Sequence, residues 1–450
     1  MSADAVAFAP ETQSCADFGN YLNQQGEDLQ GSTPGRTVLI QGNRNAHQVR
    51  QPECFAHFRC IGGDCEDTCC GGWRIPVDQE TYEKYQSLPA QRIAGKALSS
   101  LVEINPDPGP FARIRQEGAR CPALHNGLCA VQQTLGEPYL PDMCSTYPRI
   151  LNAIGNAIEV SLQLSCPEAT RLILSNPEAM AFHEGIEELP YRSRDIKWVT
   201  GDPDDCLYQI RTLVVEFIRE RSLSLGQRIA GMGFAIDTLA DVDIAGAVRL
   251  LEDHLKSLRR GSSDSTFVAV KADPMFQLKT VQDLIVGRLE TEYPRFLECY
   301  QDFRRGLAWT PESTMEQLAD RYQHAWQSFF MPFVRRHEHL LENFLISCIF
   351  RTLYPYGPKP QGQKFSIDSS REAMRHSFVR LAVHYGIVRT LLIGMAALHK
   401  DDLSVHHAVK LVQSYSRLSM NTTLFTTADI EYLEKDGGDS VRKAAGLAMD

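Results

Sequence analysis

The sequence lacks the features that direct a protein into or across a membrane. Its first basic residue is Arg36, and no continuous apolar segment precedes it, which argues against a secretory signal. The most apolar run, Leu391 to Leu398, is far shorter than the roughly 20 residues that a membrane-spanning helix needs. We therefore expect a cytoplasmic protein that binds no membrane.

A surplus of positive charge is also missing. The chain has 46 Lys and Arg residues against 56 Asp and Glu residues, which gives a formal net charge of −10. Proteins that bind nucleic acid contact its phosphates through a basic surface. We therefore expect no nucleic-acid partner.

Two cofactor-binding motifs are absent as well. Gly231 and Gly233 lie within a helical pattern, so they do not form the Gly-rich turn of a Rossmann dinucleotide site. The C-x3-C-x2-C spacing of radical S-adenosylmethionine enzymes would need a cysteine where Gly72 stands. The sequence therefore locates no site for a nucleotide-derived cofactor.

Cysteine, in contrast, is abundant. Eight of the 13 cysteines lie in two clusters, Cys60-x4-Cys65-x3-Cys69-Cys70 and Cys121-x7-Cys129-x14-Cys144-x21-Cys166. A reducing compartment and an odd number of cysteines both argue against a disulfide framework. Thiolates are strong ligands for zinc and for iron–sulfur clusters, and either centre needs four converging ligands. The clusters therefore predict a thiolate-bound metal centre and leave both metals open.

The pattern of apolar and polar residues along the chain predicts a mainly α protein. A Cys-rich, irregular metal- or cluster-binding N-terminal domain is followed by an all-α helical domain, because apolar residues after about 203 recur at helical spacing. Gly155-Asn156 predicts a hairpin within 150–164. Helices are expected near 79–88, 210–218, 244–258, 277–289, 314–330, 336–353, 371–399, 404–418 and 427–435. The predicted units are a flexible extension (1–48), the Cys-rich domain (49–202), the helical domain (203–436) and a flexible tail (437–450).

Several motifs together resemble the bacterial flagellin lysine-N-methylase family. The resemblance covers roughly residues 50 to 420, and the order of the cysteine motifs makes a chance match improbable. The motifs are FRCIGGDCEDTCCGGW at 58–73, CPAL at 121–124, GLCAVQ at 127–132, CSTYPR at 144–149, SCPEA at 165–169 and ENFLISCIFRTLYP at 342–355.

The resemblance implies methylation of lysine side chains on flagellin, or on another lysine-bearing protein. It further implies S-adenosylmethionine as the methyl donor and an iron–sulfur cluster, [4Fe-4S], with zinc as the alternative metal. The candidate ligands are Cys60, Cys65, Cys69, Cys70, Cys121, Cys129, Cys144 and Cys166. Because eight thiols exceed the need of one cluster, some of them would have structural roles.

Two residues that follow Cys144 are candidate catalytic residues. Arg149 could pair with the carboxylate of the donor, and Tyr147 could hydrogen-bond the substrate amine. The alternative is that both brace the metal centre, which is the commoner role of a buried aromatic residue. Two other functions also stay open at this point: an iron–sulfur electron-transfer protein and a zinc-stabilised interaction module without catalysis.

Overall fold

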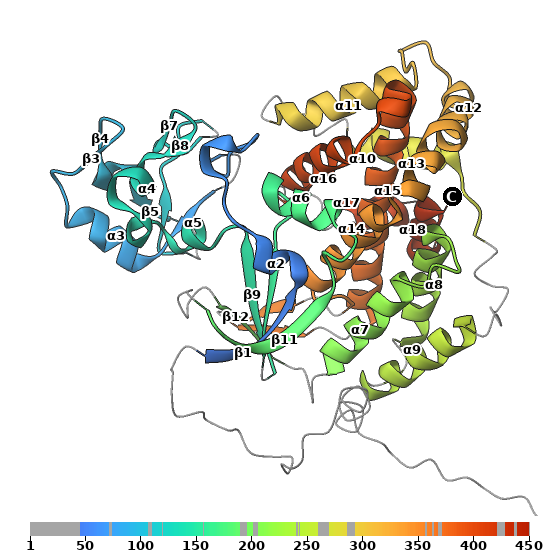
Figure 1. Ribbon diagram of the computed structural model, residues 1–450, viewed down its shortest axis with the longest axis horizontal. Coiled ribbons are helices and arrows are strands. Elements are labelled where there is room, and N and C mark those ends of the chain that lie inside the picture. The colour runs from blue at the N-terminus through green and yellow to red at the C-terminus, as the bar shows by residue number, and fades with distance from the viewer. Residues whose placement is uncertain are drawn as a thin grey trace, which may run out of the picture.

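The structure is a computed structural model, which describes residues 46–449 except for several short segments. These are 72–73, 107–109, 119, 156, 190–195, 201–205, 240–241, 243, 260–269, 286–292, 356–357, 362–363, 368–370, 421–427 and 436–438. The predicted flexible extension therefore lies almost wholly outside the described residues. Three parts follow one another in Figure 1: a small Cys-rich module, a twisted sheet and a large helical body.

The sheet has seven strands in the order β11-β1-β10-β9-β12-β14-β13. Its centre is the hairpin of β9 (Arg149–Ile154) and β10 (Ala157–Leu162), with Ile154 opposite Ala157. Gly155 occupies the turn at φ +58°, a conformation that glycine adopts without strain. The hairpin predicted within 150–164 is therefore confirmed. The other strands are β1 (Ala46–Pro52), β11 (Phe182–Glu188), β12 (Ile196–Thr200), β13 (Pro358–Gln361) and β14 (Lys364–Ile367).

This sheet corrects one part of the predicted fold, the all-α C-terminal domain. Strands β13 and β14 come from the region expected to be all α, and β14 pairs in parallel with β12 to extend the sheet. The sequence did not predict the first of these strands because it contains Pro358 and Pro360. Proline argues against a strand unless the strand lies at an edge of the sheet. β13 is the edge strand on this side. The chain is mainly helical, but it is built around a mixed sheet.

The Cys-rich module lies between β1 and β9 in the sequence and has its own small core. A three-stranded sheet of β2 (Pro76–Val77), β6 (Ala112–Ile114) and β5 (Val102–Ile104) packs with α3 (Gln79–Gln86) around Tyr85. Helix α3 begins at Asp78, whose side chain accepts a hydrogen bond from the Thr81 amide at 2.8 Å. The remaining elements are β3 (Arg92–Ile93), β4 (Lys96–Ala97), β7 (Leu124–His125), β8 (Leu128–Cys129), α4 (Ala130–Leu135) and α5 (Asp142–Thr146).

The helical body confirms the predicted helices within a few residues. Helix α12, for example, begins with a capping box between Thr314 and Gln317. The helices are α6 (Pro167–Ser175), α7 (Cys206–Ile218), α8 (Leu225–Leu239), α9 (Ile244–Arg259), α10 (Pro274–Ile285), α11 (Pro294–Gly306), α12 (Met315–Ala325), α13 (Met331–Arg336), α14 (Glu338–Arg351), α15 (Arg371–His399), α16 (Val405–Met420), α17 (Ala428–Glu434) and α18 (Ser440–Ala448). A short helix, α2 (Glu53–His57), follows β1.

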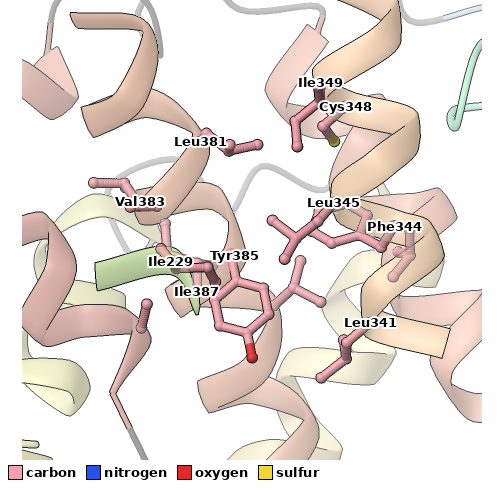
Figure 2. Packing of buried hydrophobic residues seen from close by; sticks show 14 of the residues in the cluster. Ile229, Leu341, Phe344, Leu345, Cys348, Ile349, Leu381, Val383, Tyr385 and Ile387 are labelled. Atoms are coloured by element: carbon pink, nitrogen blue, oxygen red, sulfur yellow. The ribbon is translucent and has the colours of Figure 1, made fainter. Parts of the chain in front are cut away.

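Helices α14 and α15 form the centre of the body. Figure 2 shows Leu345 of α14 pointing toward Tyr385 of α15, with Ile229 of α8 nearby. Within the described part of the chain, one helical segment, Glu372–Asp402, is long and apolar enough to cross a membrane. Its apolar window is 83% buried inside the protein, as expected of a core helix.

The C-terminal residues correct another prediction. Part of the predicted flexible tail, 437–450, forms helix α18, whose N-cap is Asp439. Val441, Ala444 and Leu447 are buried in the main core. Small residues carry little hydrophobic signal, so the sequence of this amphipathic helix does not distinguish it from a flexible tail.

Helices α11 and α15 approach each other at a pair of glycines. A Cβ atom added to Gly306 would lie 1.9 Å from the carbonyl oxygen of Gly394, and one added to Gly394 would lie 2.3 Å from Phe303. The absence of both side chains therefore sets the distance between these two helices.

Candidate metal centre

One end of the sheet carries all the loops that bear the clustered cysteines. β1 and β10 run in parallel toward this end, and β9 and β11 start from it, since Pro52 pairs with Phe182 and Arg149 with Leu162. The chain leaves Pro52 for α2 and the first cysteine cluster, and it leaves Leu162 for Cys166. It returns to Arg149 from Cys144 and Tyr147. We call this edge the thiol end of the sheet.

Five cysteines line one cavity of about 70 Å³ in the Cys-rich module. They are Cys69, Cys70, Cys121, Cys129 and Cys144, and apolar side chains such as Ile75 and Leu140 complete the walls. A backbone hydrogen bond of 2.9 Å from the Cys121 amide to the Cys70 carbonyl joins the two cysteine-bearing segments. The structure thus brings together cysteines that are up to 75 positions apart in the sequence, from Cys69 to Cys144.

The thiols of the cavity differ in acidity. A side-chain hydrogen bond from Cys70, opposed by burial, lowers the pKa of Cys129 to about 6 and that of Cys69 to about 7. The same two hydrogen bonds raise the pKa of Cys70. Burial raises the pKa of Cys121, and it raises that of Cys144 well above its usual value. Without a cation, the cavity therefore favours only some of its thiols as thiolates.

The donor set of the cavity fits a thiolate-bound metal or iron–sulfur centre in its chemistry. Five sulfur atoms exceed the four ligands that either centre needs, and a bound cation would favour the ionised form of each thiol. Within the described residues, however, no three His, Cys, Asp or Glu side chains have the convergent geometry of a metal site. The cavity is also far smaller than the roughly 300–1,000 Å³ of a typical small-molecule pocket.

The other three predicted ligands do not line this cavity. Cys60 is exposed, Cys65 is half-buried, and Cys166 is buried at the start of α6. Burial, with smaller contributions from the nearby Cys65 and Cys60, raises the pKa of Cys166 to about 12. The eight thiols are therefore divided into a group of five and a group of three. Trp73, which follows the first cluster, lies outside the described residues.

The two candidate catalytic residues have different positions. Tyr147 lines the thiol cavity, and its hydroxyl shares a 2.9 Å hydrogen bond with Ser165. Burial raises the pKa of Tyr147, so the hydroxyl stays protonated at neutral pH. Arg149 is not among the residues that line the cavity, and its guanidinium carbon lies 4.8 Å from the centre of the Phe58 ring. Tyr147 therefore has the better position to act at the cavity.

Helix α16 holds the loop that carries the first cysteine cluster. Arg417 forms a salt bridge to Asp67 with a 2.5 Å N–O distance and donates a 2.8 Å hydrogen bond to the Gly71 carbonyl. Gln413 donates to Asp67 at 2.9 Å and to the Ser165 carbonyl at 3.0 Å. We call this set of contacts the α16 clasp. It joins the helical body to the segment between Cys65 and Cys70.

Glu66 and Asp67 of this loop are therefore engaged within the protein. Besides the contacts of Asp67, Glu66 pairs with Arg171 of α6, which also pairs with Glu168. Sequence reasoning did not identify Gln413 and Arg417, because they lie on an amphipathic helix far from the cysteines. The only sequence feature that could have indicated them is the presence of polar side chains on the otherwise apolar side of that helix.

Comparisons with known proteins point to one family. The sequence profile described as FliB lysine N-methylase C-terminal domain matches residues 211–447, just over half of the chain. Over 139 residues the chain is 37% identical to the flagellar biosynthetic protein FliU of Salmonella muenchen, which covers 30% of this chain and 82% of FliU.

Two further relatives are named lysine-N-methylase. The chain is 37% identical to the protein of Salmonella choleraesuis (strain SC-B67) and 36% identical to that of Salmonella typhimurium (strain LT2), each over 139 residues. These alignments cover 30% of this chain and 35% of each relative, so the similar region spans about a third of those proteins. No solved structure matches the chain.

Proposed function

The chain belongs to the FliB lysine N-methylase family, and we propose that it methylates lysine side chains of flagellin with S-adenosylmethionine as the donor. The observation that carries the proposal is the family match over residues 211–447, together with the identity to proteins named lysine-N-methylase. The match to a protein named flagellar biosynthetic protein supports flagellin as the substrate.

We further propose that the thiol cavity holds a [4Fe-4S] cluster, with zinc as the alternative. Cys70, Cys121, Cys129 and Cys144 would be the ligands, and Cys69 would lie beside them or replace one of them. The fit of the donor set supports this assignment. When bound, such a cluster supplies a redox-active inorganic centre that fixes the positions of the surrounding loops.

The chain's own residues must prepare the lysine for methyl transfer. The lysine ammonium gives up a proton to water, its nitrogen then forms the new bond to the methyl carbon, and the bond from this carbon to the sulfonium sulfur breaks to release S-adenosylhomocysteine. The nitrogen, the carbon and the sulfur must lie in line, with water excluded. Tyr147 could orient the neutral amine, because its protonated hydroxyl can exchange the Ser165 partner for the amine nitrogen.

One experiment tests the class of reaction. The full-length protein is purified anaerobically, analysed for iron, sulfide and zinc, and incubated with flagellin and methyl-labelled S-adenosylmethionine. We expect label on flagellin lysines and about four iron atoms per chain, as one cluster requires. A reversible redox potential without label would favour an electron-transfer protein. Zinc without turnover would favour a structural module.

The α16 clasp should influence how firmly the metal is held. Changing Arg417→Met leaves Asp67 with Gln413 and the Thr68 amide, and it removes the Arg417 hydrogen bond to the Gly71 carbonyl beside Cys70. Because the partners that orient ligand-bearing loops commonly contribute about 10- to 100-fold to metal affinity, we expect loss of metal to a chelator to be faster by about tenfold or more. The loss is followed by absorbance and metal analysis, without a methylation assay.

Lys410→Met is the matched control for this variant. Lys410 lies two turns earlier on α16 and pairs with Glu298 instead of the cysteine loop. Its replacement should leave the rate of metal loss unchanged. Equal rates for the two variants would show that the clasp has no effect on the centre.

A further inference from the structure

Strand β11 forms one edge of the seven-stranded sheet. It pairs with β1 along all seven of its residues, from Phe182 opposite Pro52 to Glu188 opposite Ala46. No strand among the described residues pairs with its other side. Native edge strands are usually short, or they carry proline or lysine, which prevents the addition of another strand. β11 carries three glutamates but contains neither proline nor lysine, so neither of these residues opposes an additional strand on the outer side of the described strand.

The side chains of β11 define what could pair there. Glu184, Ile186 and Glu188 point to the same face, because side chains alternate along a strand. Ile186 is 61% exposed, more than any other exposed large hydrophobic residue in the described part of the chain. Glu188 is exposed, and Glu184 keeps 41% of its side chain exposed although it pairs with Arg50 at 3.3 Å. One face of this edge therefore carries an acidic, an apolar and a second acidic side chain in succession.

This pattern disfavours a second copy of the chain as the partner. An antiparallel copy centred on Ile186 would place Glu184 of each strand directly opposite Glu188 of the other. Like charges in such cross-strand positions destabilise the pairing. A strand with two basic residues flanking an apolar one would instead place opposite charges face to face, with apolar contact at the centre. The partner that fits is thus a basic, extended segment of another protein.

The direction of β11 connects this edge with the candidate metal centre. Phe182 lies at the thiol end of the sheet, where the amide of Glu53 also donates to the Ala181 carbonyl at 2.8 Å. Figure 1 shows this end of β11 beside α2, on the side of the sheet that leads to the Cys-rich module. A segment bound along β11 and continuing past Phe182 would reach the loops that bear the cysteines.

We propose that the outer edge of β11 binds an extended segment of the protein substrate as an eighth strand. Basic side chains lie opposite Glu184 and Glu188, an apolar side chain lies opposite Ile186, and the lysine to be modified lies beyond the Phe182 end. Backbone hydrogen bonds supply affinity, and the alternating side chains supply selectivity. This inference rests on the proposed function, in which the substrate is a lysine-bearing protein.

The variant Ile186→Lys tests the proposal in the full-length protein. It introduces a positive charge between the two glutamates, where it repels the basic partner and removes the apolar contact. Ile104→Lys is the matched control, because Ile104 is 60% exposed and ends β5, an edge strand of the small sheet. Both positions are exposed, so both variants should fold, which circular dichroism can verify.

The first measurement is the binding of a fluorescent peptide with the pattern Lys-x-Val-x-Lys, followed by anisotropy without a methyl donor. We expect Ile186→Lys to bind it about tenfold or more weakly, since like charges at an interface carry a large cost. The Ile104→Lys variant should bind like the unmodified protein. The inference is overturned if the unmodified protein fails to bind this peptide, if Ile186→Lys binds it equally well, or if a Glu-x-Val-x-Glu peptide binds as tightly.

Methylation kinetics separate this inference from the proposed function. We expect Ile186→Lys to raise KM for flagellin while kcat stays unchanged, because the edge positions the substrate and does not take part in the reaction. Methylation with the same KM in both proteins would reject the β11 site and leave the proposed function standing. Peptide binding at β11 without any methyl transfer would support the β11 site and reject the proposed function.

Discussion

A Cys129→Ala variant is expected to lose its bound metal and at least about 100-fold of its methyl-transfer activity, since even residues that only support a metal ligand contribute 10- to 100-fold. Cys129 lies at the N-terminus of α4, and its sulfur contacts Cys70 in the thiol cavity. A hydrogen bond from Cys70 lowers its pKa to about 6, so it ionises more readily than a free thiol and is a suitable ligand for a cation. Metal analysis of anaerobically purified protein and the labelled-methyl assay measure the two effects.

The control for this variant is Cys348→Ala. Cys348 is buried in α14 in the main core and does not line the thiol cavity. Its replacement removes one sulfur atom from the core, at a cost of about 1 kcal/mol, the usual size of such changes. The metal content should stay unchanged. If Cys129→Ala retained the metal and Cys348→Ala lost it, the assignment of the ligands would be wrong.

A Gly306→Ala variant is expected to be strongly destabilised. The added methyl group would lie 1.9 Å from the Gly394 carbonyl oxygen and 2.9 Å from the Leu398 amide nitrogen, both on the backbone of α15. Backbone atoms of a central helix cannot rotate away, so the two helices must separate. Overpacking of this kind costs about 1–3 kcal/mol and can cost more where backbone has to move. We expect a loss in the free energy of unfolding at the upper end of this range. It should appear as a lower midpoint of chemical denaturation.

Gly446→Ala, in the neighbouring helix α18, should have the opposite effect on stability. Gly446 lies within α18, and a methyl group there would meet its nearest neighbours at an ordinary 4.0 Å. Alanine is favoured over glycine inside a helix by about 0.8–1.0 kcal/mol. This variant should therefore be as stable as the unmodified protein or more stable. Equal losses in both variants would indicate that the close approach of α11 and α15 is not rigid.

The helical body was predictable because its signals are local. Apolar residues at helical spacing located α14 and α16, and Asp78 marked the start of α3. The sheet was not, because its seven strands come from four separate parts of the chain. The β9–β10 and β13–β14 hairpins each lie within one continuous stretch, but only the first, with its glycine turn, was predicted. Parallel pairings such as β1 with β10 depend on tertiary contacts that no short window of sequence contains.

The candidate site was predictable in its chemistry but only partly in its geometry. The cysteine clusters identified the thiols, and five of the eight lie around one cavity. Spacing alone could not show that Cys60, Cys65 and Cys166 lie elsewhere, since these positions depend on how the loops leave the sheet. The contacts of Asp67 with Gln413 and Arg417 join the two ends of the described chain. No short stretch of the sequence indicates a contact between residues so far apart.

The order of the strands has a consequence for biosynthesis. The Cys-rich module is continuous between α2 and β9, so all five sulfur atoms of its cavity are present in the growing chain once residue 144 has been added. The sheet needs β14, which ends at Ile367, before its last parallel pair can form. Because contacts between distant segments form late, the module should mature first and take up its inorganic partner while the remainder of the chain is still being translated.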